Sequence, residues 1–110
     1  MSKIPELGPR EFTQRWPGFP DGTVILLDVR EAHELNIASI PGTLDIPMAE
    51  IPGRLADLNP LLPIVVLCRS GARSLHVADF LAANGCDEVY NLKGGINAWA
   101  REVDPAVPCY

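Results

Sequence analysis

The sequence has no long hydrophobic run and no excess of positive charge. Its longest apolar stretch without proline is Ile64–Cys68, whereas a membrane-spanning helix needs ~20 apolar residues. Nine basic residues stand against fourteen acidic ones, and the net charge of −5 disfavours non-specific binding to nucleic acid or to an acidic membrane. Apolar residues make up 47% of the chain and charged residues 21%, which argues against disorder and coiled coil. We therefore expect one soluble domain, spanning residues 1–110, that binds neither nucleic acid nor membrane.

Paired cysteines and clustered metal ligands are also missing. The three cysteines, Cys68, Cys86 and Cys109, form no Cys-x-x-Cys motif, and both histidines lie far from them in sequence. Zinc sites need closely spaced ligands, so we expect no metal. The segment 1–6 has no apolar run after its one basic residue, so it predicts no secretory signal and favours a cytoplasmic location with reduced cysteines.

Short apolar runs alternate with helical patterns along the chain. The runs that predict strands are Thr23–Val29, Thr43–Ile46, Ile64–Leu67 and Val89–Leu92, and the patterns that predict helices are Pro9–Trp16, Ile51–Leu58, Ser74–Asn84 and Ile96–Val103. Continuous apolarity, rather than alternation, is typical of strands buried on both faces of a parallel sheet. The order predicts an open parallel α/β sheet with helices on both faces, and residues 105–110 read as an extended tail.

In such sheets ligands bind at the carboxyl ends of the strands, so the loop after Ile64–Leu67 is the place to look for chemistry. This loop is Cys68-Arg69-Ser70-Gly71-Ala72-Arg73, followed by the predicted helix. Gly71 gives the backbone the freedom to turn its N–H groups inward, and the helix start adds the positive end of its dipole. The backbone of Ser70, Gly71, Ala72 and Ser74 should therefore form an anion cradle that lowers the pKa of the Cys68 thiol.

A cysteine that ends an apolar strand is most often a small core residue, and a loop with arginine and glycine is often only a solvated turn. Here a cysteine, a glycine, two arginines and a helix start fall within seven residues at the functional end of a strand. This combination favours a reactive Cys68 over a merely structural one.

The loop Cys68–Ser74 resembles the active-site loop of the rhodanese family of sulfurtransferases. Leu27–Glu31 is similar to the family's second-strand motif, and Ile40–Gly42 with Leu44–Pro47 to its Pro-Gly segment. Asn91–Trp99 resembles its C-terminal signature. These matches run from Val24 to Trp99 in the family's order. The chain departs from the pattern at Ala38-Ser39, where the family often has Gly-His, and we interpret this as a surface difference.

The resemblance implies a five-stranded parallel sheet and a two-step sulfur transfer without a cofactor. Cys68 would take the outer sulfur of thiosulfate or a similar anionic donor, release sulfite, and pass sulfur from a persulfide to cyanide, a thiol or an acceptor protein. Arg69 and Arg73 would bind the anionic donor, since arginine recognises oxyanions with several N–H groups.

Two other functions compete with this prediction. Cysteine phosphatases place one more residue between cysteine and arginine than the four that separate Cys68 from Arg73, so a phosphatase or arsenate reductase is disfavoured. A persulfide relay that delivers sulfur to a partner enzyme, with little free turnover, needs the same cysteine and stays open as the alternative.

The remaining marked residues favour structural roles. For Asp28 and Arg30, at the end of a buried strand, we expect an ion pair or hydrogen bonds that fix nearby loops. His33 and His76 read as surface or packing residues, Trp16 and Trp99 as anchors in the core or at the domain edge, Gly94-Gly95 as a tight turn, and Cys86 as a half-buried filler. Cys109, in the proline-rich tail, could act as a resolving thiol.

Overall fold

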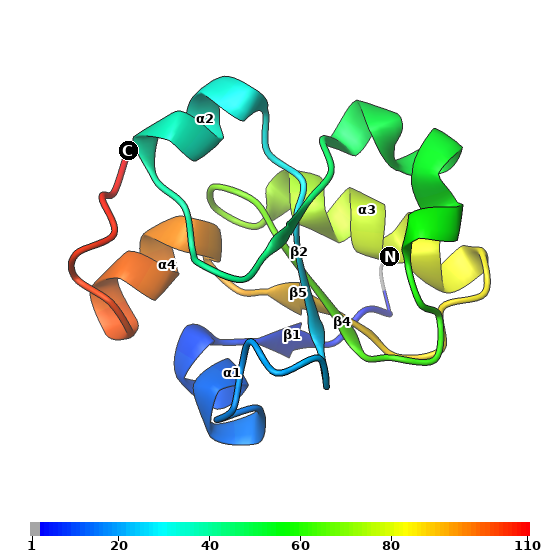
Figure 1. The fold of residues 1–110 in the computed structure, drawn as a ribbon, viewed down its shortest axis with the longest axis horizontal. Coiled ribbons are helices and arrows are strands. Elements are labelled where there is room, and N and C mark those ends of the chain that lie inside the picture. The colour runs from blue at the N-terminus through cyan, green and yellow to red at the C-terminus, as the bar shows by residue number, and fades with distance from the viewer. Residues whose placement is uncertain (1–2) are drawn as a thin grey trace.

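The computed structural model describes residues 3–110, which form a five-stranded parallel sheet covered by helices (Figure 1). The strands are β1 (Glu6–Leu7), β2 (Ile25–Asp28), β3 (Leu44–Asp45), β4 (Ile64–Leu67) and β5 (Val89–Leu92). The helices are α1 (Pro9–Arg15), α2 (Ala32–Ile37), the 3₁₀ segment η1 (Met48–Asp57), α3 (Ala72–Ala83) and α4 (Gly95–Glu102). The strand order β1-β5-β4-β2-β3 confirms the predicted α/β class and sheet.

Two hydrophobic clusters occupy the two faces of the sheet. One joins α1 and α4 to the sheet, where the Phe12 ring lies 5.7 Å from the ring of Trp99. The other joins α3 and η1 to the opposite face through Val77, Leu81 and Ile51. Figure 1 shows the same separation, with α1 and α4 on one side of the strands and α3 and η1 on the other. Because both faces are covered, the strands need the continuous apolar runs seen in the sequence.

The central strand β4 lies between β5 and β2, and all four of its residues are fully buried. Its carboxyl end pairs with the end of β2, where Asp28 is opposite Leu67. Cys68 follows directly, so the topology places the thiol at the middle of the sheet edge. Side chains from the ends of β2 and β5 can therefore reach it from both sides.

Two of the expected elements differ in the structure, and two elements, β1 and α2, lie outside all of the expected ranges. The helix predicted from Ser74 begins two residues earlier, at Ala72, because Gly71 at φ +114° makes the turn that ends the loop. The helix predicted at Ile51–Leu58 is instead the 3₁₀ segment η1, which contains Pro52 and a non-helical break at Arg54. The fifth strand, β1, has only two residues, too short to give an apolar pattern.

The segment after α4 packs back onto the domain. The backbone turns at Asp104, whose carbonyl accepts a hydrogen bond from Val107 N–H at 3.1 Å, and the Val107 side chain is buried in the core cluster of α1 and α4. The chain then runs to Tyr110, and Figure 1 shows this end beside α2. Within residues 3–110, none of the helices has the length and apolarity needed to cross a bilayer.

Candidate active site

Cys68 is the first residue of the loop between β4 and α3, and its side chain is buried, with 1% of the residue's surface exposed. The Gly71 backbone N–H donates a hydrogen bond to the sulfur at 3.1 Å, and the hydroxyl oxygen of Ser74 lies 3.3 Å from it. The left-handed backbone of Gly71, which a residue with a Cβ rarely adopts, aims this N–H at the sulfur. The loop therefore closes on the thiol from two directions.

These donors determine the acidity of the thiol. Burial alone would raise the pKa of Cys68. It is outweighed by the Ser74 hydroxyl and by the backbone N–H groups of Ser74, Gly71 and Ser70, so the pKa of Cys68 lies below its ordinary value. Of the four backbone positions expected to form the anion cradle, Ser70, Gly71 and Ser74 act on the sulfur, while Ala72 is the first residue of α3.

Helix α4 holds the other side of the loop. The backbone N–H of Ile96 donates to the Cys68 carbonyl at 2.9 Å, and that of Asn97 donates to the Arg69 carbonyl at 3.3 Å. Gly95 has φ +59°, and a Cβ there would collide with both of these carbonyl oxygens. Because the loop carbonyls point toward α4, the loop N–H groups are free to face the sulfur.

Asn91, on β5, holds the loop through hydrogen bonds to Ser74 and to the backbone of Gly71. Its side-chain oxygen accepts the Ser74 hydroxyl proton at 2.5 Å, and its side-chain NH₂ group donates to the Gly71 carbonyl at 3.1 Å. It is 1% exposed, in a strand that is otherwise apolar or aromatic. The sequence analysis missed this residue, although a lone amide in the short run Val89–Leu92 was a usable signal, because buried polar side chains need partners.

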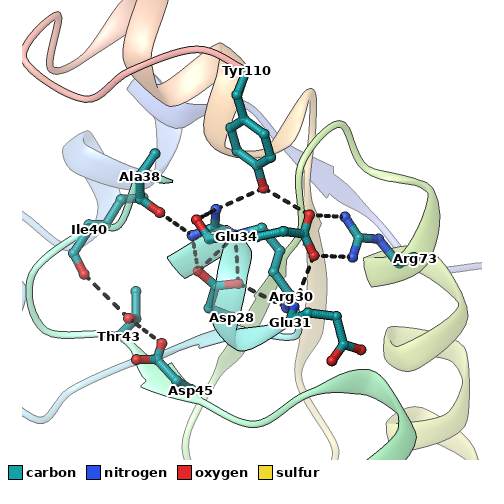
Figure 2. Close-up of polar contacts among 10 residues, drawn as sticks. All are labelled: Asp28, Arg30, Glu31, Glu34, Ala38, Ile40, Thr43, Asp45, Arg73 and Tyr110. Atoms are coloured by element: carbon teal, nitrogen blue, oxygen red, sulfur yellow. Dashed lines mark hydrogen bonds and ion pairs between the residues drawn. The ribbon is translucent and has the colours of Figure 1, made fainter. Parts of the chain in front are cut away.

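Arg73 is held in a bidentate ion pair with Glu34, at the base of α2 (Figure 2). Each of its terminal nitrogens lies 2.7 Å from one carboxylate oxygen, and the Glu34 side chain is only 9% exposed. Hydrogen bonds from Arg73 lower the pKa of Glu34 to about 2, despite burial. The pKa of Arg73 is correspondingly raised, chiefly by Glu34, and the nearby sulfur of Cys68 contributes in the same direction.

Behind this pair lies a second, fully buried one. Arg30 donates to both carboxylate oxygens of Asp28, with a closest distance of 2.7 Å, and both side chains have no exposed surface. Arg30 also donates to the carbonyls of Glu34 and Ala38, which ties the start and the end of α2 to the sheet. This confirms the expected structural pairing of Asp28 and Arg30.

Arg69 points to the end of the chain. Its guanidinium donates to the main-chain carbonyl of Tyr110 and lies over the Tyr110 ring, with its central carbon 4.9 Å from the ring centroid. The sequence analysis did not anticipate Glu34 or Tyr110 as neighbours of the loop arginines, since no local pattern links residues so far apart in the chain.

The other marked residues lie outside the loop. His76 is exposed on α3 beside an apolar surface pocket, and His33 is exposed on α2. Trp99 is buried in the core, while Trp16 is partly buried against it. Cys86 is more buried than expected, at 7% exposure, and Cys109 is exposed, with its thiol 3.6 Å from the Asn97 carbonyl.

Comparison with known proteins places this site in a family. Residues 18–102 match the model of the rhodanese-like domain. The chain is 38% identical over 104 residues to a sulfurtransferase of Allochromatium vinosum, covering 94% of this chain and 95% of that protein. It is 43% identical over 89 residues to the rhodanese-like/PpiC domain-containing protein 12, chloroplastic, of Arabidopsis thaliana, of whose length it spans 30%.

Solved structures agree with the sequence matches. A rhodanese-like domain protein from Staphylococcus aureus superimposes with a TM-score of 0.80 at 28% identity, over 97% of this chain and 99% of that one. The fold, the order of the motifs and the loop around Cys68 lead to one conclusion: the chain belongs to the rhodanese-like domain family of sulfurtransferases.

Proposed function

We propose that this protein transfers sulfane sulfur through a persulfide on Cys68, with thiosulfate or a similar anion as the donor. The observation that carries the proposal is the arrangement around the sulfur: a hydroxyl and three backbone N–H groups lower the pKa of a buried thiol. A thiol with a lowered pKa ionises more readily, and once it is a thiolate it needs no separate base before it attacks.

In the first step the Cys68 thiolate attacks the outer sulfur of thiosulfate. A new S–S bond forms, the bond between the two sulfur atoms of thiosulfate breaks, and sulfite leaves with the electron pair. In the second step cyanide or a thiolate attacks the outer sulfur of the persulfide and takes it, which returns Cys68 as a thiolate. The loop N–H groups would stabilise the anionic sulfur at both stages.

Arg69 and Arg73 would bind the dianionic donor and its sulfite product. Their guanidinium groups would offset the repulsion that a chain of net charge −5 exerts on an anion, Arg69 most of all, because Arg73 is already paired with Glu34. We place the reaction in the cytoplasm, a location supported by the three free thiols.

The test is intact-mass spectrometry of the reduced protein after a brief incubation with thiosulfate. Wild type should gain one sulfur atom and lose it on addition of cyanide, whereas Cys68→Ser should gain none. Cys86→Ser and Cys109→Ser are matched controls and should load like wild type. Sulfur on Cys68→Ser would show that the nucleophile is wrongly assigned.

Steady-state kinetics then separate an enzyme from a relay. Turnover with small acceptors at rates that match persulfide formation supports a free sulfurtransferase. Fast loading with very slow release to cyanide and small thiols would instead favour the alternative, a persulfide relay that serves a protein acceptor. Hydrolysis of an aryl phosphate by wild type, lost in Cys68→Ser, would contradict both.

A further inference from the structure

Tyr110 contacts both arginines of the loop, one directly and one through a carboxylate. Its hydroxyl accepts a hydrogen bond from Arg30 at 2.9 Å and donates one to Glu34 at 2.9 Å, and Glu34 holds Arg73 (Figure 2). Its carbonyl and its ring are the contacts of Arg69. One residue therefore links the guanidinium groups at both ends of the catalytic loop.

The docking of Tyr110 is built from several elements. Its backbone N–H donates to the Asn97 side chain at 3.2 Å, and Asn97 itself binds the backbone of Arg69. The turn at Asp104 and the buried Val107 fix the segment that leads to it. The ring is close to two cations: the central guanidinium carbons of Arg30 and Arg69 lie 5.7 Å and 4.9 Å from its centroid.

The three arginines near the loop differ in the groups that hold them. Arg30 is neutralised by Asp28, and Arg73 by Glu34. Within residues 3–110, Arg69 is exposed and forms an ion pair with no side-chain carboxylate. Tyr110 is therefore the residue that holds the Arg69 guanidinium, whereas Arg30 and Arg73 are held by carboxylates.

We propose that Tyr110 is a positioning residue for anion binding at Cys68: it holds Arg69 through its ring and main chain, and Arg73 through Glu34. The identity of this anion rests on the proposed function, in which it is the sulfur donor. A free arginine side chain samples many rotamers, and an anion that binds it must pay for ordering it. A guanidinium already ordered by Tyr110 binds the anion more tightly.

The test measures alkylation of Cys68 by an anion and by a neutral reagent of similar shape. Iodoacetate and iodoacetamide both react with the thiolate, so a change in the pKa or burial of Cys68 alters both rates alike. The ratio of the two rate constants reports only the attraction of the site for negative charge. Rates are followed by mass spectrometry of the peptide that contains Cys68, at low ionic strength, where exposed charges are least screened.

Tyr110→Ala should lower the iodoacetate-to-iodoacetamide ratio about threefold, the size of one exposed cation–π contact. Tyr110→Phe keeps the ring and should recover most of the wild-type ratio. Tyr90→Phe is the matched control, because the Tyr90 hydroxyl also joins an arginine and a glutamate, Arg15 and Glu88, with no contact to the loop. An unchanged or higher ratio in Tyr110→Ala would overturn the proposal.

A second measurement connects the site to the donor. Tyr110→Ala should raise the KM for thiosulfate about threefold, while release of sulfur from the preformed persulfide to cyanide keeps its wild-type rate. A slower release with an unchanged KM would contradict a positioning role. If wild type takes no sulfur from thiosulfate, the proposed donor is wrong, and the alkylation ratio still decides the role of Tyr110.

Discussion

The hydroxyl oxygen of Ser74 lies 3.3 Å from the sulfur of Cys68. A serine hydroxyl has one proton, and in this structure that proton is donated to Asn91. The thiol can then donate its own proton to the Ser74 oxygen, whereas a thiolate needs the Ser74 proton to turn toward it. Ionisation of Cys68 and the orientation of Ser74 are therefore coupled through Asn91.

Substitution of Ser74 should raise the pKa of Cys68. Ser74→Ala removes the hydroxyl whose proton can turn from Asn91 toward the thiolate, and it leaves the backbone N–H groups, so the thiol becomes less acidic while the loop is retained. The measurement is the rate of iodoacetamide alkylation of Cys68 against pH, whose midpoint should move to higher pH. Ser70→Ala, in the same loop but exposed, is the control and should keep the wild-type midpoint. A midpoint that does not move in Ser74→Ala would show that the Ser74 hydroxyl does not lower the pKa of Cys68.

Glu34 should make the fold sensitive to acid. Its pKa is about 2 in the folded protein against an ordinary 4.5, so the unfolded chain binds its proton first as the pH falls. The stabilisation is complete above pH 4.5 and is lost as the pH falls toward 2, an effect on the order of 3 kcal/mol. Urea denaturation at several pH values measures it.

In that experiment Glu34→Gln should show a flatter pH dependence below 4.5. Glu88→Gln removes an ion pair whose side chains are about half exposed, at 48% and 46%, and should leave the dependence close to wild type. If the pH dependence of the free energy of unfolding flattened equally in both variants, the ion pair of Glu34 would not be the cause of the acid sensitivity.

The two loop arginines should differ in what they do for stability. Arg73→Ala leaves the nearly buried carboxylate of Glu34 without its partner, which costs about 2 kcal/mol. Arg69→Ala removes an exposed side chain and should cost less than about 0.5 kcal/mol. Both should raise the KM for thiosulfate about tenfold, the value of one charge-assisted hydrogen bond. Unchanged kinetics in either variant would exclude that arginine from donor binding.

A side chain at position 95 should break the contact between loop and helix. Gly95→Ala places a Cβ against the carbonyl oxygens of Cys68 and Arg69 and forces a positive φ on alanine, so the free energy of unfolding should fall by about 2 kcal/mol or more. Gly53→Ala, where nothing lies near the added methyl group, should be close to neutral. Thermal denaturation compares the two, and equal melting temperatures would refute the steric argument.

The sequence predicted the parts of this protein that depend on local pattern. Buried parallel strands such as Ile64–Leu67 have continuous apolar runs, and the loop after Leu67 combines residue types that point to an anionic sulfur. The helix boundary at Ala72 was missed because the turn depends on the exact φ of Gly71. Strand β1 was missed because two residues make no pattern.

The environment of the loop arginines could not be predicted in this way. Glu34 and Arg73 are 39 residues apart, and Arg69 and Tyr110 are 41 apart. Each pair meets only because the sheet order brings the ends of β2, β4 and β5 together. A single sequence gives the chemical type of these side chains but not their partners.

The hydrogen bonds from α4 to the carbonyls of Cys68 and Arg69 also have a consequence for a chain during synthesis. Cys68 leaves the ribosome well before Ile96 and Asn97, the residues that fasten its loop. Until they have been added, the N–H groups of the loop are not held on the sulfur, and the thiol has the acidity of an ordinary cysteine. The lowered pKa of Cys68 is thus a property of the whole folded domain, including its last helix, and not of the six-residue loop alone.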